Sequence, residues 1–205
     1  MVKEYYANQW HFFRKQLLPM FIILLLLSIL MGYLTYHYCM DHPDKTKSRL
    51  YSTYQNAFEK SGLITKSGLK LMIEIFWANL LICLKSIILG FVPFLFLPAI
   101  GVFSSVMQIG LFLAGFKLFT EMDQFSLFVS LLPHGIFEIA ASLYASSVGV
   151  YLTIQTSKMI FHKSRSKGVP IKALCKQAAH SFILIVVPLL IVAAFIEAFI
   201  SSIPK

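Results

Sequence analysis

Charged residues are scarce in this sequence, and their scarcity decides its structural class. Only 13% of its 205 residues are charged, 58% are hydrophobic, and the mean hydropathy is +0.74. A soluble globular domain has about 25% charged and about 45–50% apolar residues, because polar groups must cover its surface. The composition therefore excludes a lone soluble domain, a disordered chain and a coiled coil, and it indicates an integral membrane protein.

Paired cysteines and known catalytic motifs are also lacking. Cys39, Cys83 and Cys175 are isolated in the sequence, which excludes a disulfide framework and a zinc ribbon. The HExxH motif of metalloproteases and the phosphate-binding motifs of nucleotide-binding proteins do not occur. The net charge of +9 does not require nucleic acid, because basic loops against anionic lipid account for it. We therefore expect no nucleic-acid partner, and the missing motifs favour a protein that is not an enzyme.

Five separated apolar runs are what the sequence does contain. The longest uncharged stretch lies between Lys85 and Lys117. As one helix it would be about 46 Å long, too long for a hydrocarbon core of about 30 Å. Pro93 and Pro98 also interrupt it, so we divide it into two helices. The sequence thus predicts an all-α membrane protein with a single domain over residues 1–205 and a bundle of five transmembrane helices, at residues 17–38, 70–91, 99–119, 127–153 and 182–203.

Two polar segments connect these helices and bear on their orientation. The segment 155–181 carries six basic residues and no acidic one, so the positive-inside rule predicts that it is an inner loop. The N-terminus is then inside and the C-terminus outside, and the segment 39–69 is an outer loop. Within that outer loop, residues 51–60 form either a short amphipathic helix on the membrane or part of a plain extramembrane loop, and both interpretations stay open.

Several polar side chains fall inside the predicted spans. An ionisable group at the bilayer centre costs roughly 2.5–3.5 kcal/mol on insertion scales, so such groups face the bundle interior and pair. In the predicted topology they all lie in the outer half of the bilayer: Glu74, Asn79, Gln108, His134, Glu138 and Glu197. His134 and Glu138 are four residues apart and share one helix face.

Three interpretations of these polar residues stay open. They pin helices together through hydrogen bonds, or they form a proton or ion path, or they bind a divalent metal such as zinc. In the metal interpretation the ligands are His134, Glu138 and Glu197, because imidazole with carboxylates suits such ions. Asn79, Gln108 and Glu74 are expected to be structural or neighbouring polar groups, since amides in spans most often bond neighbouring helices.

Two sequence stretches carry a family resemblance. Residues Leu132–Ala141, with the sequence LPHGIFEIAA, resemble the signature of the stage II sporulation protein M family. Residues Ala193–Phe199 resemble its C-terminal motif. Leu80 departs from the second position of a family Asn–Asn pair that begins at Asn79, and Gln108 stands where the family often has asparagine. The resemblance covers about residues 70–203.

The resemblance implies a non-enzymatic scaffold in the bacterial cytoplasmic membrane. Founding members of the family anchor peptidoglycan-degrading enzymes, a lytic transglycosylase and an amidase/endopeptidase, during engulfment of the forespore in sporulation. The alternative is a transport-related membrane subunit whose buried His/Glu cluster binds an ion or metal, and a weaker option is a metal-dependent membrane hydrolase. Each option has the lipid bilayer as a partner, and assembly of the chain into a homo-oligomer stays open.

Overall fold

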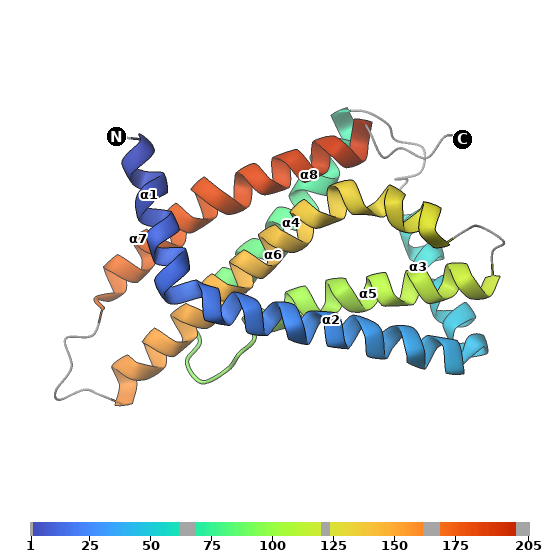
Figure 1. The fold of residues 1–205 in the computed structure, drawn as a ribbon, viewed down its shortest axis with the longest axis horizontal. Helices are drawn as coiled ribbons and strands as arrows, with labels where there is room; N and C mark the ends of the chain where they lie inside the picture. Colours follow the sequence, from blue (N-terminus) through green and yellow to red (C-terminus); the bar gives the residue numbers. More distant parts are fainter. Residues whose placement is uncertain (1, 62–68, 120–123, 162–168, 200–205) are drawn as a thin grey trace.

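The fold is helical along nearly all of the chain that the structure describes (Figure 1). The computed structural model describes the backbone of residues 2–61, 69–119, 124–161 and 169–199. Within these ranges it describes every side chain except those of residues 2, 53–61, 71, 124–132, 134 and 161. Apart from single residues and short turns, the described residues belong to the following elements: α1 Val2–Phe12, the π-helical turn η1 Phe13–Leu17, α2 Leu18–Asp41, α3 Pro43–Ser61, α4 Leu69–Leu89, α5 Pro98–Phe119, α6 Gln124–Phe161, α7 Ile171–Ser181, the π-helical turn η3 Phe182–Val186 and α8 Val187–Phe199.

Five helical segments of the described chain are long and apolar enough to cross a membrane. They are Lys3–Asp41, Met72–Leu89, Pro98–Phe119, Gly135–Ile160 and Ile171–Phe199. The helix allows such a crossing because it satisfies every backbone hydrogen bond internally. The predicted all-α fold with five spans is confirmed, and the chain is an integral membrane protein.

Several helices extend beyond the spans predicted from hydropathy. The first helical segment begins at Val2 and α6 runs to Phe161, whereas the predicted spans are residues 17–38 and 127–153. The helix predicted at 70–91 ends at Leu89, and the one predicted at 99–119 begins at Pro98. The helix predicted at 182–203 begins at Ile171 and is described as far as Phe199. Hydropathy finds the membrane-buried part of a helix, and these helices continue past it as polar or amphipathic turns.

The two predicted loops are largely helical. Most of segment 39–69 is α3, Pro43–Ser61. Residues 51–60 are therefore helical, and the helix begins earlier than the short one considered from the sequence. Segment 155–181 contains the end of α6 and the whole of α7. Helix α7 buries Leu174, Ala178 and Ser181 and exposes basic residues. Hydropathy detects spans by a long run of apolar residues, so it does not detect an amphipathic helix of this kind.

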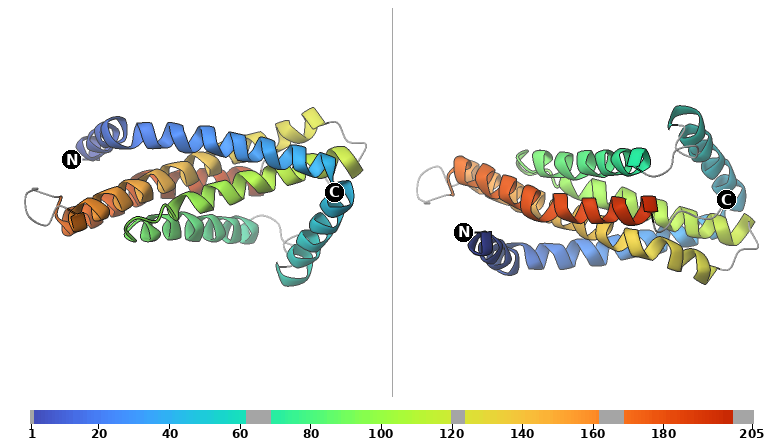
Figure 2. Two further views of the ribbon diagram at one scale, coloured as in Figure 1. Left: turned by 90° about the horizontal axis from the view of Figure 1, so that it is seen from below. Right: turned by 90° about the horizontal axis from the view of Figure 1, so that it is seen from above.

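The ends of the bundle carry different short helices. Figure 2 shows α1 and α7 at one end and α3 at the opposite end. Gln9 on α1 is 4% exposed, and its Oε1 accepts hydrogen bonds from Gln177 Nε2 and Ser181 Oγ, each at 3.1 Å. The N-terminal helix is therefore fixed to the last helical segment of the chain. Helix α8 ends at the α3 end of the bundle (Figure 2), as an odd number of crossings requires.

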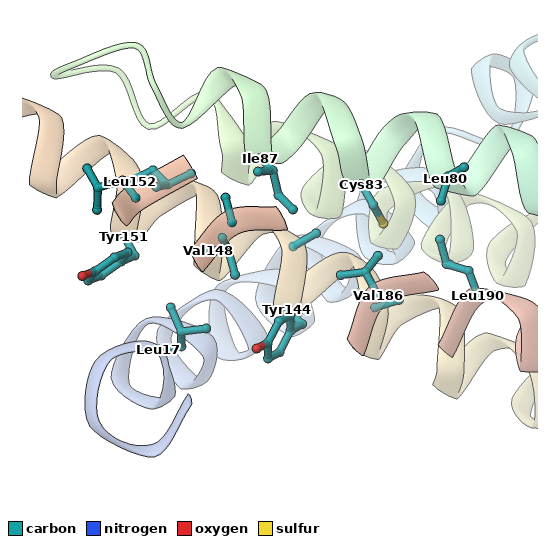
Figure 3. Close-up of a cluster of buried hydrophobic side chains, with 14 residues drawn as sticks. Leu17, Leu80, Cys83, Ile87, Tyr144, Val148, Tyr151, Leu152, Val186 and Leu190 are labelled. Carbon is teal, nitrogen blue, oxygen red and sulfur yellow. The ribbon is translucent and has the colours of Figure 1, made fainter. Parts of the chain in front are cut away.

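Helix α6 lies at the centre of the bundle. All of its residues from 141 to 153 are buried. The largest described core cluster packs residues of η1, α4, α6, α7, η3 and α8 together, and Figure 3 labels ten of its members: Leu17, Leu80, Cys83, Ile87, Tyr144, Val148, Tyr151, Leu152, Val186 and Leu190. Because lipid tails are as apolar as these side chains, close van der Waals packing holds the helices together.

Glycines let three helices cross tightly near one end of the bundle. A Cβ atom on Gly149 would lie 2.6 Å from Pro98 Cβ and still closer to the Ser86 carbonyl oxygen, and a Cβ atom on Gly90 would overlap the Gly149 backbone. Thr153 Oγ1 donates a hydrogen bond to the Gly90 carbonyl oxygen at 3.1 Å across this contact. We call this region of α4, α5 and α6 the glycine crossing.

Candidate functional site

A cavity of about 460 Å³ lies between α4, α5 and α6, on the far side of the glycine crossing from residues 90–97. The three helices are in contact at Gly149 and Pro98. Farther along, at the level of Asn79 and Glu138, space remains between them, and this space is the cavity. Most of its wall is apolar. The polar and thiol-bearing residues that line it are Asn79, Cys83, Ser104, Ser105, Gln108, Glu138 and Ser142.

One hydrogen bond joins two helices at this cavity. Asn79 Nδ2 on α4 donates to Glu138 Oε1 on α6, and both side chains are half-buried. Glu138 is also near enough to Glu197 on α8 for the two carboxyl groups to interact electrostatically. Three helices thus bring polar groups to one level of the bundle, as the predicted depths of these residues require.

The hydroxyl of Ser142 differs from those of Ser147 and Thr156 on the same helix. Ser147 Oγ donates to the Leu143 carbonyl oxygen at 2.6 Å, and Thr156 Oγ1 donates to the Leu152 carbonyl oxygen at 2.9 Å, so these hydroxyls are satisfied by their own helix. Ser142 is 8% exposed, and its Oγ is buried without a hydrogen-bond partner in the described structure. It lies one helical turn beyond Glu138 on the same face and lines the same cavity. A buried hydroxyl without a partner costs free energy, so this group is available to a ligand.

The cavity is open to the outside of the bundle, because described lining residues of α4, α5 and α6, Ile82 among them, are exposed. Ser104 and Gln108 on α5 are exposed, and Ile136 on α6 is 55% exposed, and all three line the cavity. Gln108 is near the middle of the span Pro98–Phe119, so its exposed amide is at lipid depth. An exposed amide in lipid lacks the partners that water would provide, which makes this opening chemically distinct from the rest of the lipid-facing surface.

The structure brings together some of the predicted polar residues. Asn79, Gln108 and Glu138 line one cavity, and Glu197 lies close to Glu138. Glu74 is half-buried on α4 and does not line this cavity. His134 belongs to α6, but its side chain lies outside the described residues.

The metal site at His134, Glu138 and Glu197 stays a prediction. Among the residues that the structure describes, no three His, Cys, Asp or Glu side chains lie together as a metal would require. Because the side chain of His134 is not among them, this observation does not test the predicted ligand set. The described part of the set is two carboxyl groups within electrostatic range of each other, one of which already accepts a hydrogen bond from Asn79.

Sequence reasoning missed the serines of this site. Ser104, Ser105 and Ser142 line the cavity, and none of them is among the polar residues singled out from the sequence. The available signal was the spacing, because Ser142 follows Glu138 by four residues, just as Cys83 follows Asn79. The cavity itself leaves no sequence signal, since it depends on how far α5 and α6 separate beyond the glycine crossing.

The fold and the polar cluster define a polytopic helical membrane protein with a partly polar interior. The chain belongs to the stage II sporulation protein M family, whose family model matches residues 21–202. This match confirms the predicted family and extends over the first span, which the motifs alone did not reach. No curated protein and no solved structure matches the chain.

Proposed function

We propose that this protein is a non-enzymatic membrane scaffold that holds partner proteins at the α3 end of the bundle. The observation that carries the proposal is α3 itself, a polar 19-residue helix that is fixed to the spans. Thr46 Oγ1 donates to the carbonyl oxygens of Cys39 and His42 at 2.9 Å, and Leu50 packs with Cys39, Leu111 and Ala114. A helix held in this way presents its outer face at a constant position, which suits a docking element.

The partners that the family resemblance suggests are peptidoglycan-degrading enzymes that act in engulfment. Such enzymes work outside the cytoplasmic membrane, so the proposal requires α3 to be outside and the N-terminus inside. Exposed lysines and arginines occur at both ends of the described bundle, six at the α1 and α7 end (Lys3, Arg14, Lys15, Lys158, Lys172 and Lys176) and five at the α3 end (Lys45, Lys47, Arg49, Lys70 and Lys117). The support for this orientation therefore comes from segment 155–181, which carries six basic residues and no acidic one, as the positive-inside rule expects of a cytoplasmic segment.

Recovery of the two enzyme types with the tagged protein tests the scaffold function. Asp44, Lys45 and Ser48 are exposed on α3, and the triple alanine variant should reduce recovery of a lytic transglycosylase or an amidase/endopeptidase several-fold. The matched control is Lys172→Ala with Lys176→Ala on α7, at the other end of the bundle. Equal recovery with both variants, at equal membrane content, would contradict docking on α3.

A transport-related function is the second candidate. The observation that favours it is the carboxyl pair Glu138 and Glu197 beside a cavity within the spans. In this function the pair binds an ion, with His134 as a further ligand if the ion is a metal such as zinc. Metal analysis of the purified protein with and without His134→Ala tests it. Stoichiometric metal that the substitution removes would support the function, and a metal-free protein after purification in zinc-containing buffer would contradict the metal version.

A further inference from the structure

The cavity between α4, α5 and α6 has the dimensions of a ligand site. Its volume of about 460 Å³ falls within the range of roughly 300–1,000 Å³ that is usual for pockets that enclose small molecules. Its wall is mainly aliphatic and aromatic, including Ile82, Val102, Ile109, Phe112 and Ile139. An aliphatic chain would find contacts there that resemble those of the protein core.

Two polar side chains of α6 in the cavity have hydrogen-bonding capacity for a ligand. Glu138 accepts a hydrogen bond from Asn79 and keeps acceptor capacity for a second donor. One turn away, Ser142 is more than nine-tenths buried and its Oγ has no partner in the described structure. These groups would hold a ligand group that donates hydrogen bonds.

The charge of the site selects among such ligands. None of the described residues that line the cavity is a lysine or an arginine, and the carboxyl group of Glu197 is within electrostatic range of that of Glu138. A phosphate or carboxylate headgroup would be repelled by these two carboxyl groups when they are ionised. An amine would be attracted to them, and a hydroxyl would be tolerated.

The exposed part of the cavity wall gives access from the bilayer. Ser104, Gln108 and Ile136 are exposed there, at a depth where the surroundings are lipid tails. A molecule that enters here from the membrane brings its apolar chain through an apolar environment. Its polar end meets the amide of Gln108 before it reaches Glu138.

We propose that this cavity binds an aliphatic amphiphile from the bilayer whose headgroup is not anionic and donates hydrogen bonds, with an amine preferred over a hydroxyl. The headgroup contacts Glu138 and Ser142, and the chain lies against the apolar wall. This inference goes beyond the scaffold function and does not depend on docking at α3.

Photolabelling in nanodiscs tests the proposal with the full chain. The probes are long-chain molecules that carry a photoreactive group and an alkyne, identical except for an amine, an alcohol or a carboxylic acid at the end. Mass spectrometry locates the labelled residues. We expect the amine to label the cavity wall about tenfold more than the acid, because a charge-assisted hydrogen bond is lost with the acid. Unlabelled long-chain amine should compete with it.

Two substitutions separate ligand binding from general effects on the fold. Gly135 lines the cavity, and a Cβ atom there meets no other atom within 4 Å, so Gly135→Leu has room to reduce the cavity without a clash. It should lower labelling by all three probes. Glu138→Gln keeps the shape of the side chain and should remove the preference for the amine over the alcohol.

The serine pair supplies the matched control. Ser142 and Ser146 are both buried on α6 without a hydrogen-bond partner, but only Ser142 lines the cavity. Ser142→Ala should weaken amine labelling several-fold, and Ser146→Ala should leave it unchanged. Equal labelling by the amine and the acid would overturn the proposed ligand class. Labelling spread over lipid-facing residues, with no change in Gly135→Leu, would overturn the site.

Discussion

Helices α4, α5 and α6 behave differently at the glycine crossing and at the cavity. At the crossing, Gly149 lets the backbones of α4 and α6 touch, and Thr153 Oγ1 donates a hydrogen bond to the backbone carbonyl of Gly90, the residue that follows α4. At the cavity, the same helices are linked through side chains, from Asn79 to Glu138, around about 460 Å³ of space. The same three helices are thus packed backbone to backbone at one level of the bundle and enclose a cavity at another level.

The largest expected effect is at the crossing. Gly149→Ala adds a methyl group that would overlap the Ser86 carbonyl and Pro98, and both neighbours are held by their own helices. We expect a loss of about 3 kcal/mol in the free energy of unfolding, at the upper end for added volume in a packed core. Thermal unfolding of the purified protein in detergent measures it. An unchanged unfolding temperature would show that the helices are not in contact at Gly149.

The second effect concerns the hydrogen bond at the cavity. Asn79→Leu leaves Glu138 without its donor and should cost about 1–3 kcal/mol of unfolding free energy. Replacing both residues with leucine should cost less than the two single changes together, because no stranded partner remains. A double-mutant cycle of chemical unfolding measures this coupling. Additive effects on the free energy of unfolding would show that Asn79 and Glu138 do not interact.

A smaller effect of opposite sign is expected at the cavity wall. Gly135→Ala meets no atom within 4 Å, in contrast to Gly149→Ala. Since alanine favours the helix over glycine by about 0.5–1 kcal/mol, the variant should be at least as stable as the parent protein. The same unfolding assay compares the two glycine variants directly. A loss of stability at Gly135 as large as that at Gly149 would remove the distinction between the crossing and the cavity.

The smallest effect belongs to the hydroxyl at the crossing. Thr153→Val removes the hydrogen bond to Gly90 while it keeps the shape of the side chain, and bonds between membrane helices contribute about 0.6 kcal/mol on average. Thr156→Val is the control, because the hydrogen bonds from Thr156 go to carbonyls of its own helix. The Thr153 variant should unfold at a slightly lower temperature than the Thr156 variant. The reverse order would mean that Thr153 does not connect the two helices.

Hydropathy and charge were enough to predict the class of fold. Five spans follow from apolar runs, and the shared depth of Asn79, Gln108 and Glu138 follows from counting residues along each helix. Depth does not determine direction around the helix axis, so the contact between Asn79 and Glu138 and the position of Gln108 at the opening required the structure. The structure shows one hydrogen bond between polar groups of two helices, from Asn79 to Glu138, and the predicted meeting of His134, Glu138 and Glu197 stays a prediction.

Other features were out of reach of the sequence for different physical reasons. Helix α7 is amphipathic and basic, so its composition resembles a loop until its buried face has a neighbour to pack against. The π-helical turn at residues 13–17 has no recognisable sequence pattern. The direction of the chain changes there, between α1 and α2 (Figure 1). The role of Gly149 depends on the position of Pro98 and Ser86, which lie on two other helices.

Chemical cross-linking between residues 79 and 138 tests whether α4 and α6 meet at the cavity. In a protein with Cys39, Cys83 and Cys175 replaced by alanine, Asn79→Cys and Glu138→Cys are combined and treated with a short bifunctional thiol reagent. Cysteines at 138 and 142 provide the positive control, since residues four apart on a helix are neighbours. If the two helices meet there, the cysteines at 79 and 138 should be cross-linked within one chain as efficiently as the control pair. Linking of the control pair alone would show that α4 and α6 do not meet at the cavity.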